Sequence, residues 1–325
     1  MQNVLAWVVL FVALSGGASH AQQREMRVGW LTTWSNGSFS DLTRRSFELG
    51  LRDAGFVEGK NLVFVRRSAN GDVGQFPALA RDLVKQNVDV IFAPSKPMAD
   101  AAWYASRKIP TVIATVADPV AVEYVRSLAR PGGHITGVTT ASAELTAKRL
   151  ELLREAVPGT TRVAVLYDQR LYESCRVELT VLDAAAKKLG LTLIRVSASN
   201  AAEIDGAFAR MVAAKVQGVI IPLTSSTGEA SSEIVRAAQK YRLPVIHEVS
   251  EFASVGYFIT YGPDYSDIFR RAGHYVARIL KGEKPAEMAM EEPARFRLTV
   301  NLKTARALGI VVPQSVLVRA DEVIE

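Results

Sequence analysis

The chain has few of the residues from which disulfides, metal sites and catalytic triads are built. It contains one cysteine, Cys175, and four histidines among 325 residues. A single cysteine can form no internal disulfide and has no second thiol with which to share a metal ion. We therefore expect no metal, and the fold must be stabilised by the size of its core.

The motifs that mark nucleotide and catalytic sites are also missing or incomplete. The loop after the first predicted strand, TTWSNGSFSD, lacks G-x-G-x-x-G, and neither a phosphate-binding G-x-x-x-x-G-K-[ST] nor a G-x-S-x-G elbow occurs. HEVSE at 247–251 has Glu251 where a zinc protease needs its second histidine, and it follows a strand instead of lying in a helix. We expect no cofactor and no catalytic residue.

The charge is modest and dispersed. Lys and Arg number 39 against 33 Asp and Glu, a net charge of +6, and they are spread along the helical segments. Nucleic-acid binding needs a concentrated basic surface, so we do not expect it.

Only the N-terminus carries a long apolar run, VLAWVVLFVAL at 4–14. Small residues at Ser19 and Ala21 follow it at the spacing of a signal-peptide cleavage site, so we expect residues 1–21 to be removed before Gln22 and the protein to be periplasmic. No cysteine lies near that point, which argues against a lipid anchor. A buried N-terminal helix is the alternative.

From about residue 26 the sequence alternates β-rich runs with helical patterns. The β-rich runs lie at 27–33, 61–68, 88–95, 110–116, 134–140, 161–168, 191–197, 216–223, 244–249 and 257–262. The helical patterns lie at 39–56, 76–87, 143–157, 177–190, 203–215, 229–242 and 264–282. Several strands are apolar throughout, as in parallel sheets covered on both faces. The sequence predicts a doubly wound α/β fold.

The pattern restarts near residue 161, where TRVAVLYD echoes RVGWLTT near residue 27, so we expect two similar lobes. In open α/β sheets the ligand crevice lies outside the carboxyl ends of the strands. The candidate ligand-binding residues are those that follow strands: Trp34, Ser35, Asn36, Ser95, Lys96, Asp118, Thr139, Thr140, Asp168, Tyr172, Thr224, Ser225, His247, Glu248 and Tyr261.

Several longer segments resemble one known family. SLARPGGHITGVT (127–139), KRLELLREAVPG (148–159), YGPDYSDIFRRAGHYVARILKGEKPAE (261–287) and NLKTARALGIVVPQSVLVRADEVIE (301–325) are similar to the ABC-transporter substrate-binding proteins whose better-known members bind tryptophan, tyrosine and phenylalanine. The resemblance implies a type I periplasmic-binding-protein fold, with two Rossmann-like lobes joined by a three-crossing hinge. Mapped on this chain, it implies lobe 1 at 26–139 and 247–281, and lobe 2 at 140–246 and 282–325.

The segment APSKPMAD at 93–100 places a lysine where a buried strand becomes a helix. The first turn of a helix offers unpaired N–H groups and a positive dipole, which suit a ligand carboxylate. We expect Pro97 at the first helical position, with Ser95 and Lys96 facing the crevice. Relatives have small neutral residues here. Lys96 either pairs with an anionic solute, or swings into solvent or pairs with Asp118 or Glu248.

An amino-acid ligand would need a carboxylate for its ammonium group, and the candidates are Asp118, Asp168 and Glu248. Asp118 has an equally good alternative as the cap of the turn that follows it. His247 and Glu248 stand where relatives have an aromatic residue and glycine, so they alter selectivity. We expect Asp264 to cap a helix.

Aromatic side chains are candidates for stacking on a planar ligand. Trp34 and Tyr172 fall in crevice loops, whereas Trp30 lies within a strand and belongs to the core.

The resemblance implies a monomer that captures a small carboxylate-bearing solute, an aromatic amino acid or aromatic acid, and presents it to an ABC permease in the membrane. Two alternatives stay open: a ligand-sensing subunit for a signalling partner, and an enzyme on the same scaffold.

Overall fold

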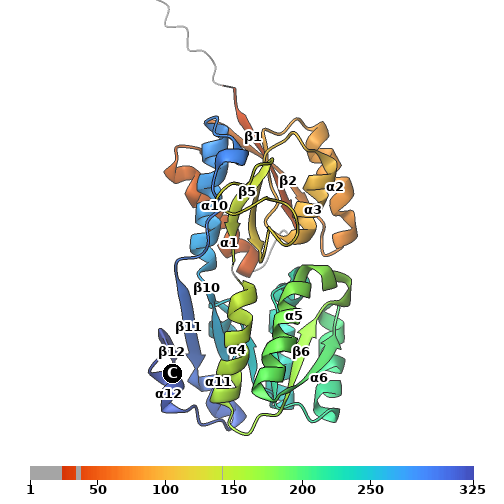
Figure 1. Ribbon diagram of the computed structural model, residues 1–325, viewed down its shortest axis with the longest axis vertical. Coiled ribbons are helices and arrows are strands. Elements are labelled where there is room, and N and C mark those ends of the chain that lie inside the picture. Colours follow the sequence, from red (N-terminus) through yellow and green to blue (C-terminus); the bar gives the residue numbers. More distant parts are fainter. Residues whose placement is uncertain (1–23, 34–37, 141) are drawn as a thin grey trace, which may run out of the picture.

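Two α/β lobes lie end to end in the molecule (Figure 1). The computed structural model describes residues 24–33, 38–140 and 142–325. We call the five-stranded sheet with its covering helices lobe 1, and the seven-stranded sheet with its covering helices lobe 2. In the part of the chain so described, no helix is long and apolar enough to cross a membrane.

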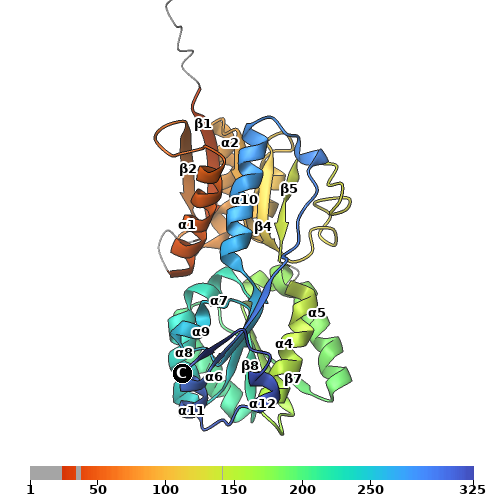
Figure 2. The same cartoon turned by 90° about the vertical axis from the view of Figure 1, so that its left-hand side faces the viewer.

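Lobe 1 contains a parallel sheet in the order β2-β1-β3-β4-β5. Helices α1 and α10 pack against each other on one face, and α2 and α3 pack together on the other (Figure 2). The elements are β1 (Met26–Thr32), α1 (Ser38–Asp53), β2 (Leu62–Ser68), α2 (Phe76–Lys85), β3 (Val90–Phe92), α3 (Lys96–Ala105), β4 (Thr111–Val116), β5 (Ile135–Thr139) and α10 (Tyr265–Leu280).

Lobe 2 has the strand order β12-β11-β10-β9-β8-β6-β7, parallel except where β10 meets β11. Its strands are β6 (Arg162–Tyr167), β7 (Thr192–Ser197), β8 (Gly218–Ile220), β9 (Val245–His247), β10 (Ile259–Pro263), β11 (Phe296–Asn301) and β12 (Glu322–Ile324). Its helices are α4 (Ser142–Ala156), α5 (Tyr172–Leu189), α6 (Ile204–Ala213), α7 (Ser225–Glu229), α8 (Ser231–Tyr241), α9 (Phe252–Val255), α11 (Leu302–Leu308) and α12 (Gln314–Leu317).

The apolar strands fold this way because both faces of each sheet are covered. Along β6, Val163 and Val165 point into the cluster formed with α4 and α5, whereas Ala164 and Leu166 point into the cluster formed with α6 and α8. Both sets of side chains are buried, so the strand needs no polar face. The predicted α/β fold with two largely parallel sheets is confirmed.

The chain passes between the lobes at three places, two of which differ from expectation. The first follows Thr139 at the end of β5. The expected second crossing near His247 is wrong, because β9 and β10 hydrogen-bond into the lobe 2 sheet and the chain returns to lobe 1 only after Pro263. The expected third crossing near Gly282 also comes too early. Glu291 still bonds to lobe 1, where its N–H donates to the Gly137 carbonyl, and it is followed by β11 in lobe 2.

Helix α10 is held on lobe 1 by a close crossing with α1. A Cβ atom added at Gly50 would lie 1.9 Å from the Arg270 carbonyl oxygen, and one added at Gly273 would lie 2.3 Å from the Phe47 carbonyl oxygen. Contacts this short with backbone atoms cannot be relieved by turning a side chain. The glycines therefore set the distance between the helices. The capping role expected for Asp264 is confirmed, since its side chain accepts from the Asp267 N–H at the start of α10.

We predict that Gly50→Ala lowers the free energy of unfolding by about 1–3 kcal/mol, because the added methyl group forces the two helix backbones apart. Gly206→Ala is the matched control, since Gly206 lies inside α6 and its added Cβ would come no closer than 3.8 Å to the Arg210 side chain. It should gain about 0.5–1 kcal/mol from reduced backbone entropy. Urea unfolding of both variants checks this. Equal stability of the two variants would show that the α1–α10 crossing tolerates a larger residue.

Candidate functional site

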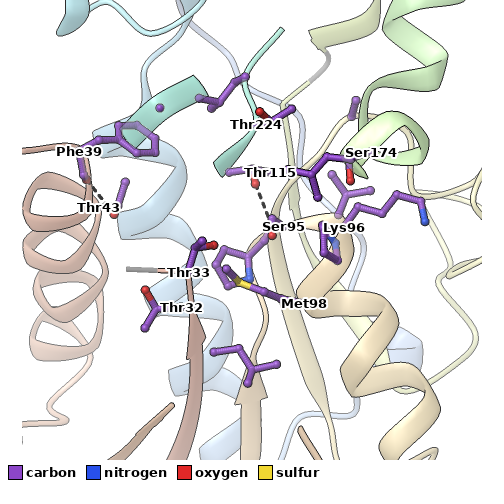
Figure 3. Close-up of a pocket in the computed structure, with 18 of the residues that line it drawn as sticks. Thr32, Thr33, Phe39, Thr43, Ser95, Lys96, Met98, Thr115, Ser174 and Thr224 are labelled. Atoms are coloured by element: carbon purple, nitrogen blue, oxygen red, sulfur yellow. Dashed lines mark hydrogen bonds between the residues drawn. The ribbon is translucent and has the colours of Figure 1, made fainter. Parts of the chain in front are cut away.

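A cavity of about 310 Å³ lies between the two lobes. This volume is at the small end of the range for ligand sites in proteins. Lobe 1 contributes residues that follow β1, β3 and β4 and residues from α1 and α10, whereas lobe 2 contributes residues from α5, α7 and the ends of β8 and β9. Figure 3 shows side chains from both lobes pointing into the same space.

The carboxyl ends of the lobe 1 strands supply the polar part of this cavity. Thr32 and Thr33 lie at the end of β1, Ser95 follows β3, and Thr115 lies near the end of β4. The Thr115 hydroxyl donates to the Pro94 carbonyl at 3.0 Å, which ties the β3–α3 loop to the neighbouring strand. Parallel strands bring their carboxyl ends to one edge, so these hydroxyls meet there.

The start of α3 presents unpaired backbone donors to the cavity. Ser95 is the N-cap, but its side chain makes no capping bond. The Ala99 N–H donates to the Ser95 carbonyl at 2.8 Å, and Pro97 has no N–H. Within the described structure, Lys96 and Met98 are therefore the first-turn residues whose backbone N–H groups are free to bind an anion. The expected place of Pro97 is wrong by one residue, because α3 begins at Lys96.

Lys96 lines the cavity and is held in place by its own helix. Its Nζ lies 2.8 Å from Asp100 Oδ2, one helical turn along, and its side chain is 19% exposed. Asp100 also accepts a hydrogen bond from the Tyr124 hydroxyl. The alternative partners Asp118 and Glu248 are therefore wrong, and so is a lysine that swings into solvent.

Asp118 both lines the cavity and caps a turn. Its Oδ1 accepts from the N–H groups of Val120 at 3.1 Å and Ala121 at 2.8 Å. The capping alternative is confirmed, and a carboxylate so occupied has less capacity left for a ligand.

Apolar side chains form the wall beside these polar groups. They come from α1, α3 and α10 in lobe 1, and from α5, the turn before α5 and the segment after β8 in lobe 2: Phe39, Met98, Phe269, Val177, Leu171 and Leu223. Trp30 touches the cavity, but it is buried in an aromatic cluster with Phe47 at a centroid distance of 4.8 Å. Its expected place in the core is confirmed.

The lobe 2 side combines a helix cap with buried carboxylates. Thr224 lines the cavity and forms a capping box with Thr227 at the start of α7. At the end of that helix, Glu229 Oε1 accepts from the Ser40 hydroxyl of α1 at 3.2 Å, a contact between the lobes. Glu178 of α5 and Glu248 after β9 also face the cavity, and both are buried.

Several other candidates do not line the cavity. Thr139 is buried and donates to the Ala117 carbonyl, Tyr172 packs against Tyr167 at a centroid distance of 6.5 Å, and Tyr261 contributes its carbonyl to Arg149. Thr140 is buried between the first crossing and α4. A position after a strand therefore does not by itself place a side chain in the cavity.

His247 is also buried away from the cavity. Its Nδ1 accepts from the Val249 N–H at 3.0 Å, and its ring packs against Phe252 and Tyr257. Burial, with the neighbouring Arg149 guanidinium, lowers the pKa of His247 to about 3, so the ring is neutral. His247 therefore does not line the cavity in this structure.

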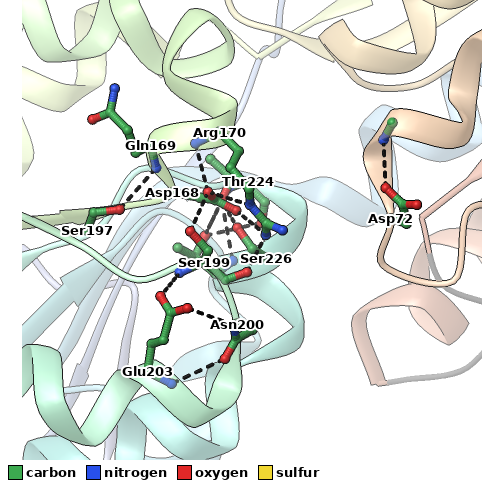
Figure 4. A network of polar contacts seen from close by, with 12 residues as sticks. Asp72, Asp168, Gln169, Arg170, Ser197, Ser199, Asn200, Glu203, Thr224 and Ser226 are labelled. Atoms are coloured by element: carbon green, nitrogen blue, oxygen red, sulfur yellow. Dashed lines mark hydrogen bonds and ion pairs between the residues drawn. The ribbon is translucent and has the colours of Figure 1, made fainter.

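Asp168 is fully buried within a polar network of lobe 2 (Figure 4). Its Oδ2 lies 2.8 Å from Arg170 Nη2, while Oδ1 accepts from the Arg170 N–H at 2.9 Å and from the Ser199 hydroxyl at 3.1 Å. Burial alone would raise the pKa of Asp168, but the hydrogen bonds from Arg170, Ser226 and Ser199 outweigh it and lower the pKa. This carboxylate orders the β6–α5 loop and does not line the cavity.

Three of the candidates, Trp34, Ser35 and Asn36, lie outside the described residues. Ser225 begins α7, but its side chain is outside the described part. Of the expected positions whose side chains the structure describes, those that line the cavity are Ser95, Lys96, Asp118, Thr224 and Glu248.

Several of the cavity residues that the sequence did not reveal lie inside helices. Thr43 of α1, Ser174 and Glu178 of α5, and Phe269 of α10 all face the cavity. Glu178 could have been suspected, because a carboxylate on the apolar side of a helical pattern is a buried charge that needs a partner.

Two α/β lobes joined by three chain passages, with a cavity between the carboxyl ends of their sheets, define the type I periplasmic-binding-protein fold. Solved structures share this architecture. A conserved domain protein from Vibrio cholerae matches with a TM-score of 0.84 and 27% identity, covering 92% of this chain and 100% of the other. An ABC domain from Streptococcus pneumonia in complex with L-Trp matches with a TM-score of 0.83 and 24% identity over the same shares.

The sequence places the chain more narrowly. Residues 36–324 match the model of the ABC transporter substrate binding protein family, and the chain belongs to that family. A tyrosine-binding protein of Clostridioides difficile is 25% identical over 270 residues, which cover 83% of this chain and 77% of that protein. The resemblance inferred from sequence is confirmed, and the family is one of transporter binding proteins and not of enzymes.

We predict that Asp168→Asn destabilises the protein at neutral pH and leaves ligand affinity unchanged. The folded-state pKa of Asp168 is lowered, so its stabilisation is present above the ordinary pKa of 3.8 and is lost as pH falls through the folded value. The parent should therefore lose stability on acidification below about pH 4 more steeply than the variant. Unfolding midpoints from pH 2 to 7, with affinity measured at pH 7, check both statements. A weaker ligand affinity in a folded variant would show that Asp168 contributes to ligand binding.

Proposed function

We propose that this protein captures a small carboxylate-bearing solute, an aromatic amino acid or aromatic acid, by closing its two lobes around it. The observation that carries the proposal is the interlobe cavity, whose polar end is formed by the start of α3 and whose wall is apolar. The distant relatives named above as tyrosine-binding and in complex with L-Trp support the same class of solute.

The start of α3 supplies what a carboxylate needs. The N–H groups of Lys96 and Met98 are free, the helix dipole is positive at this end, and the Lys96 ammonium adds a full charge. Asp100 offsets part of that charge but lies one turn deeper in the helix. The hydroxyls of Ser95 and Thr115 flank the same region and provide further donors.

The remaining surface suits a planar ring. Phe39, Met98 and Phe269 form an apolar wall, and aromatic rings gain both burial energy and edge-to-face contact from such surroundings. Arg44 and Arg66 lie at the margin of this wall and contribute their stems as well as their charges.

Closure is supported by contacts that only adjacent lobes can make. The Ser40 hydroxyl of α1 donates to Glu229 of α7, and the Phe39 ring lies 5.9 Å from that of Phe252 in α9. Opening the lobes would break these contacts and admit solvent to the cavity. A hinge motion of this kind converts ligand binding into a change of shape.

The shape change is then presented to a partner in the membrane. Membership of the family makes an ABC transporter the assembly that this protein serves. We propose that the protein works in the periplasm after removal of residues 1–21 as a signal peptide. The mature protein would bind an ABC permease as a monomer and present its solute there.

A thermal-shift screen of the protein without residues 1–21 tests the solute class. At a ligand concentration 100 times Kd, mass action stabilises the folded state by about 2.7 kcal/mol, so a true solute should raise the melting temperature measurably. The panel contains aromatic amino acids and aromatic carboxylates, with neutral aromatic alcohols as controls. No shift with any charged member would contradict the proposed class.

For Lys96 we predict that Lys96→Ala weakens binding of the anionic solute at least tenfold, about 1.4 kcal/mol, because the charge at the start of α3 is lost. Lys108→Ala is the matched control, since Lys108 is exposed in lobe 1 after α3 and does not line the cavity. Calorimetric titration of both variants with the best hit of the screen measures the difference. Equal affinities would show that the lysine serves only its ion pair with Asp100.

A further inference from the structure

Three charged side chains are buried together on the lobe 2 side of the cavity. Arg149 of α4 places Nη2 3.5 Å from Glu178 Oε2 and Nη1 3.2 Å from Glu248 Oε2. All three residues are nearly inaccessible to solvent. The Thr146 hydroxyl, which accepts a hydrogen bond from Arg149, donates to Glu178 Oε2 at 3.2 Å. We call Arg149, Glu178 and Glu248 the buried charge cluster.

The charges in this cluster do not balance when every group is ionised. One guanidinium faces two carboxylates, which leaves a net charge of −1 in a region of low dielectric. An uncompensated buried charge costs several kcal/mol, so such a site takes up a proton or a counter-ion. Burial and the nearby Glu248 raise the pKa of Glu178 to about 8, while Arg149 opposes the shift. Near neutral pH the empty cluster therefore holds about one proton, on Glu178.

Among the described residues, no other neighbouring group supplies the missing positive charge. His247 packs beside Arg149 and is neutral because burial lowers its pKa. Cys175 on α5 is neutral too, since burial and Glu178 raise the pKa of its thiol to about 12. The Tyr265 hydroxyl at the start of α10 stays protonated, because burial and then Glu248 and Glu178 raise its pKa. The groups that face the pair from α4, α5, β9 and α10 are thus one cation and otherwise neutral donors.

The cluster also has unused hydrogen-bonding capacity toward the cavity. Glu178, Glu248 and Tyr265 all line it. Oε2 of Glu248 is attracted by Arg149 at 3.2 Å, but the alignment does not make a hydrogen bond, and among the described residues it has no donor. The Tyr265 hydroxyl lies beside Glu248 at the same edge of the cavity. Buried polar groups without partners at the edge of a cavity are expected to be completed by a ligand.

We infer that the buried charge cluster receives the ammonium group of the solute, whose positive charge replaces the proton held by Glu178. The displaced proton leaves to solvent, and no bond of the solute is made or broken. The solute is then a zwitterionic amino acid and not a simple aromatic acid. This inference rests on the proposed function, since it concerns the same cavity, and it selects one of the two solute classes that the proposed function allows.

The coupling between ligand binding and proton release determines whether affinity rises or falls with pH. A proton and an ammonium group compete for the same carboxylates, so affinity should rise with pH while the empty cluster is protonated and the occupied cluster is not. The slope approaches tenfold per pH unit. Neutral or purely anionic aromatic compounds compete with no proton and should show no such rise.

The experiment is calorimetric titration of the full chain without residues 1–21 at pH 6.0 to 7.5. The probes are L-tyrosine and L-tryptophan against 3-(4-hydroxyphenyl)propionate and indole-3-propionate, which lack only the amino group. Titrations in two buffers of different ionisation enthalpy count the protons released. We expect the amino acids to bind at least tenfold more tightly, about 1.4 kcal/mol, with release of nearly one proton at pH 7.

Two variants make the assignment specific. Glu178→Gln mimics the protonated glutamate, so the fold should be kept while the proton release and the pH slope disappear and amino-acid affinity falls. Glu151→Gln is the matched control, because Glu151 is an exposed residue of α4 paired with Lys148 and lies outside the cavity. Circular dichroism confirms that both variants are folded.

The outcomes separate the two proposals. Equal or tighter binding of the compounds that lack the amino group, or amino-acid binding without proton release, overturns this inference and leaves the proposed function standing. The same holds if Glu178→Gln retains the pH slope of the parent. Failure of every probe in both classes overturns the inference and the proposed solute class together.

Discussion

The arrangement of the two lobes depends on the packing of helix α10, which follows a strand of lobe 2, against lobe 1. Helix α10 follows a strand of lobe 2 but packs on α1 of lobe 1, where Gly50 and Gly273 allow the backbones to approach closely. Because Tyr265 at the start of this helix lines the cavity, the position of α10 also sets one wall of the site. The third passage of the chain is tied to the same helix, since Glu291 accepts hydrogen bonds from Arg271 and Tyr275. A change in the position of α10 would therefore alter the packing of lobe 1, the third passage between the lobes and the wall of the cavity together.

The electrostatics of the cavity follow from this arrangement. Lobe 1 presents a helix N-terminus and a lysine, and lobe 2 with the hinge presents two buried carboxylates that share one arginine. The two sides thus favour opposite charges. A solute that carries both can satisfy groups from both lobes, which gives closure a free-energy gain that neither lobe supplies alone.

The architecture could be predicted from the sequence because burial on both faces leaves a strong signal. The strands β1 to β10 all appeared as apolar runs, since parallel strands beneath helices need no polar side. The strands β11 and β12 did not stand out. Phe296 and Arg297 at the start of β11 are exposed, and β12 is a three-residue edge strand, so neither produces an unbroken apolar run.

The site was predictable only where strand ends define it. Ser95, Lys96 and Asp118 were found because each follows a strand of lobe 1, and parallel strands bring such residues to one edge. The same rule failed for Asp168 and His247, whose side chains turn into lobe 2 and complete its internal hydrogen bonds. Thr43, Ser174 and Glu178 enter the cavity from within helices, and their orientation depends on how the helices pack across the hinge.

Lys96 illustrates how a charge can be both partnered and available. A lysine at a helix N-terminus is unfavourable by some tenths of a kcal/mol, and Asp100 one turn later offsets this cost. The Tyr124 hydroxyl donates to Asp100 and to the Lys96 carbonyl, so the acid is fixed and the lysine has little freedom. An ammonium group carries three donors, and one bond to Asp100 leaves the others for an anion in the cavity. The ion pair therefore positions the lysine for a carboxylate at a smaller entropy cost than a free side chain would incur.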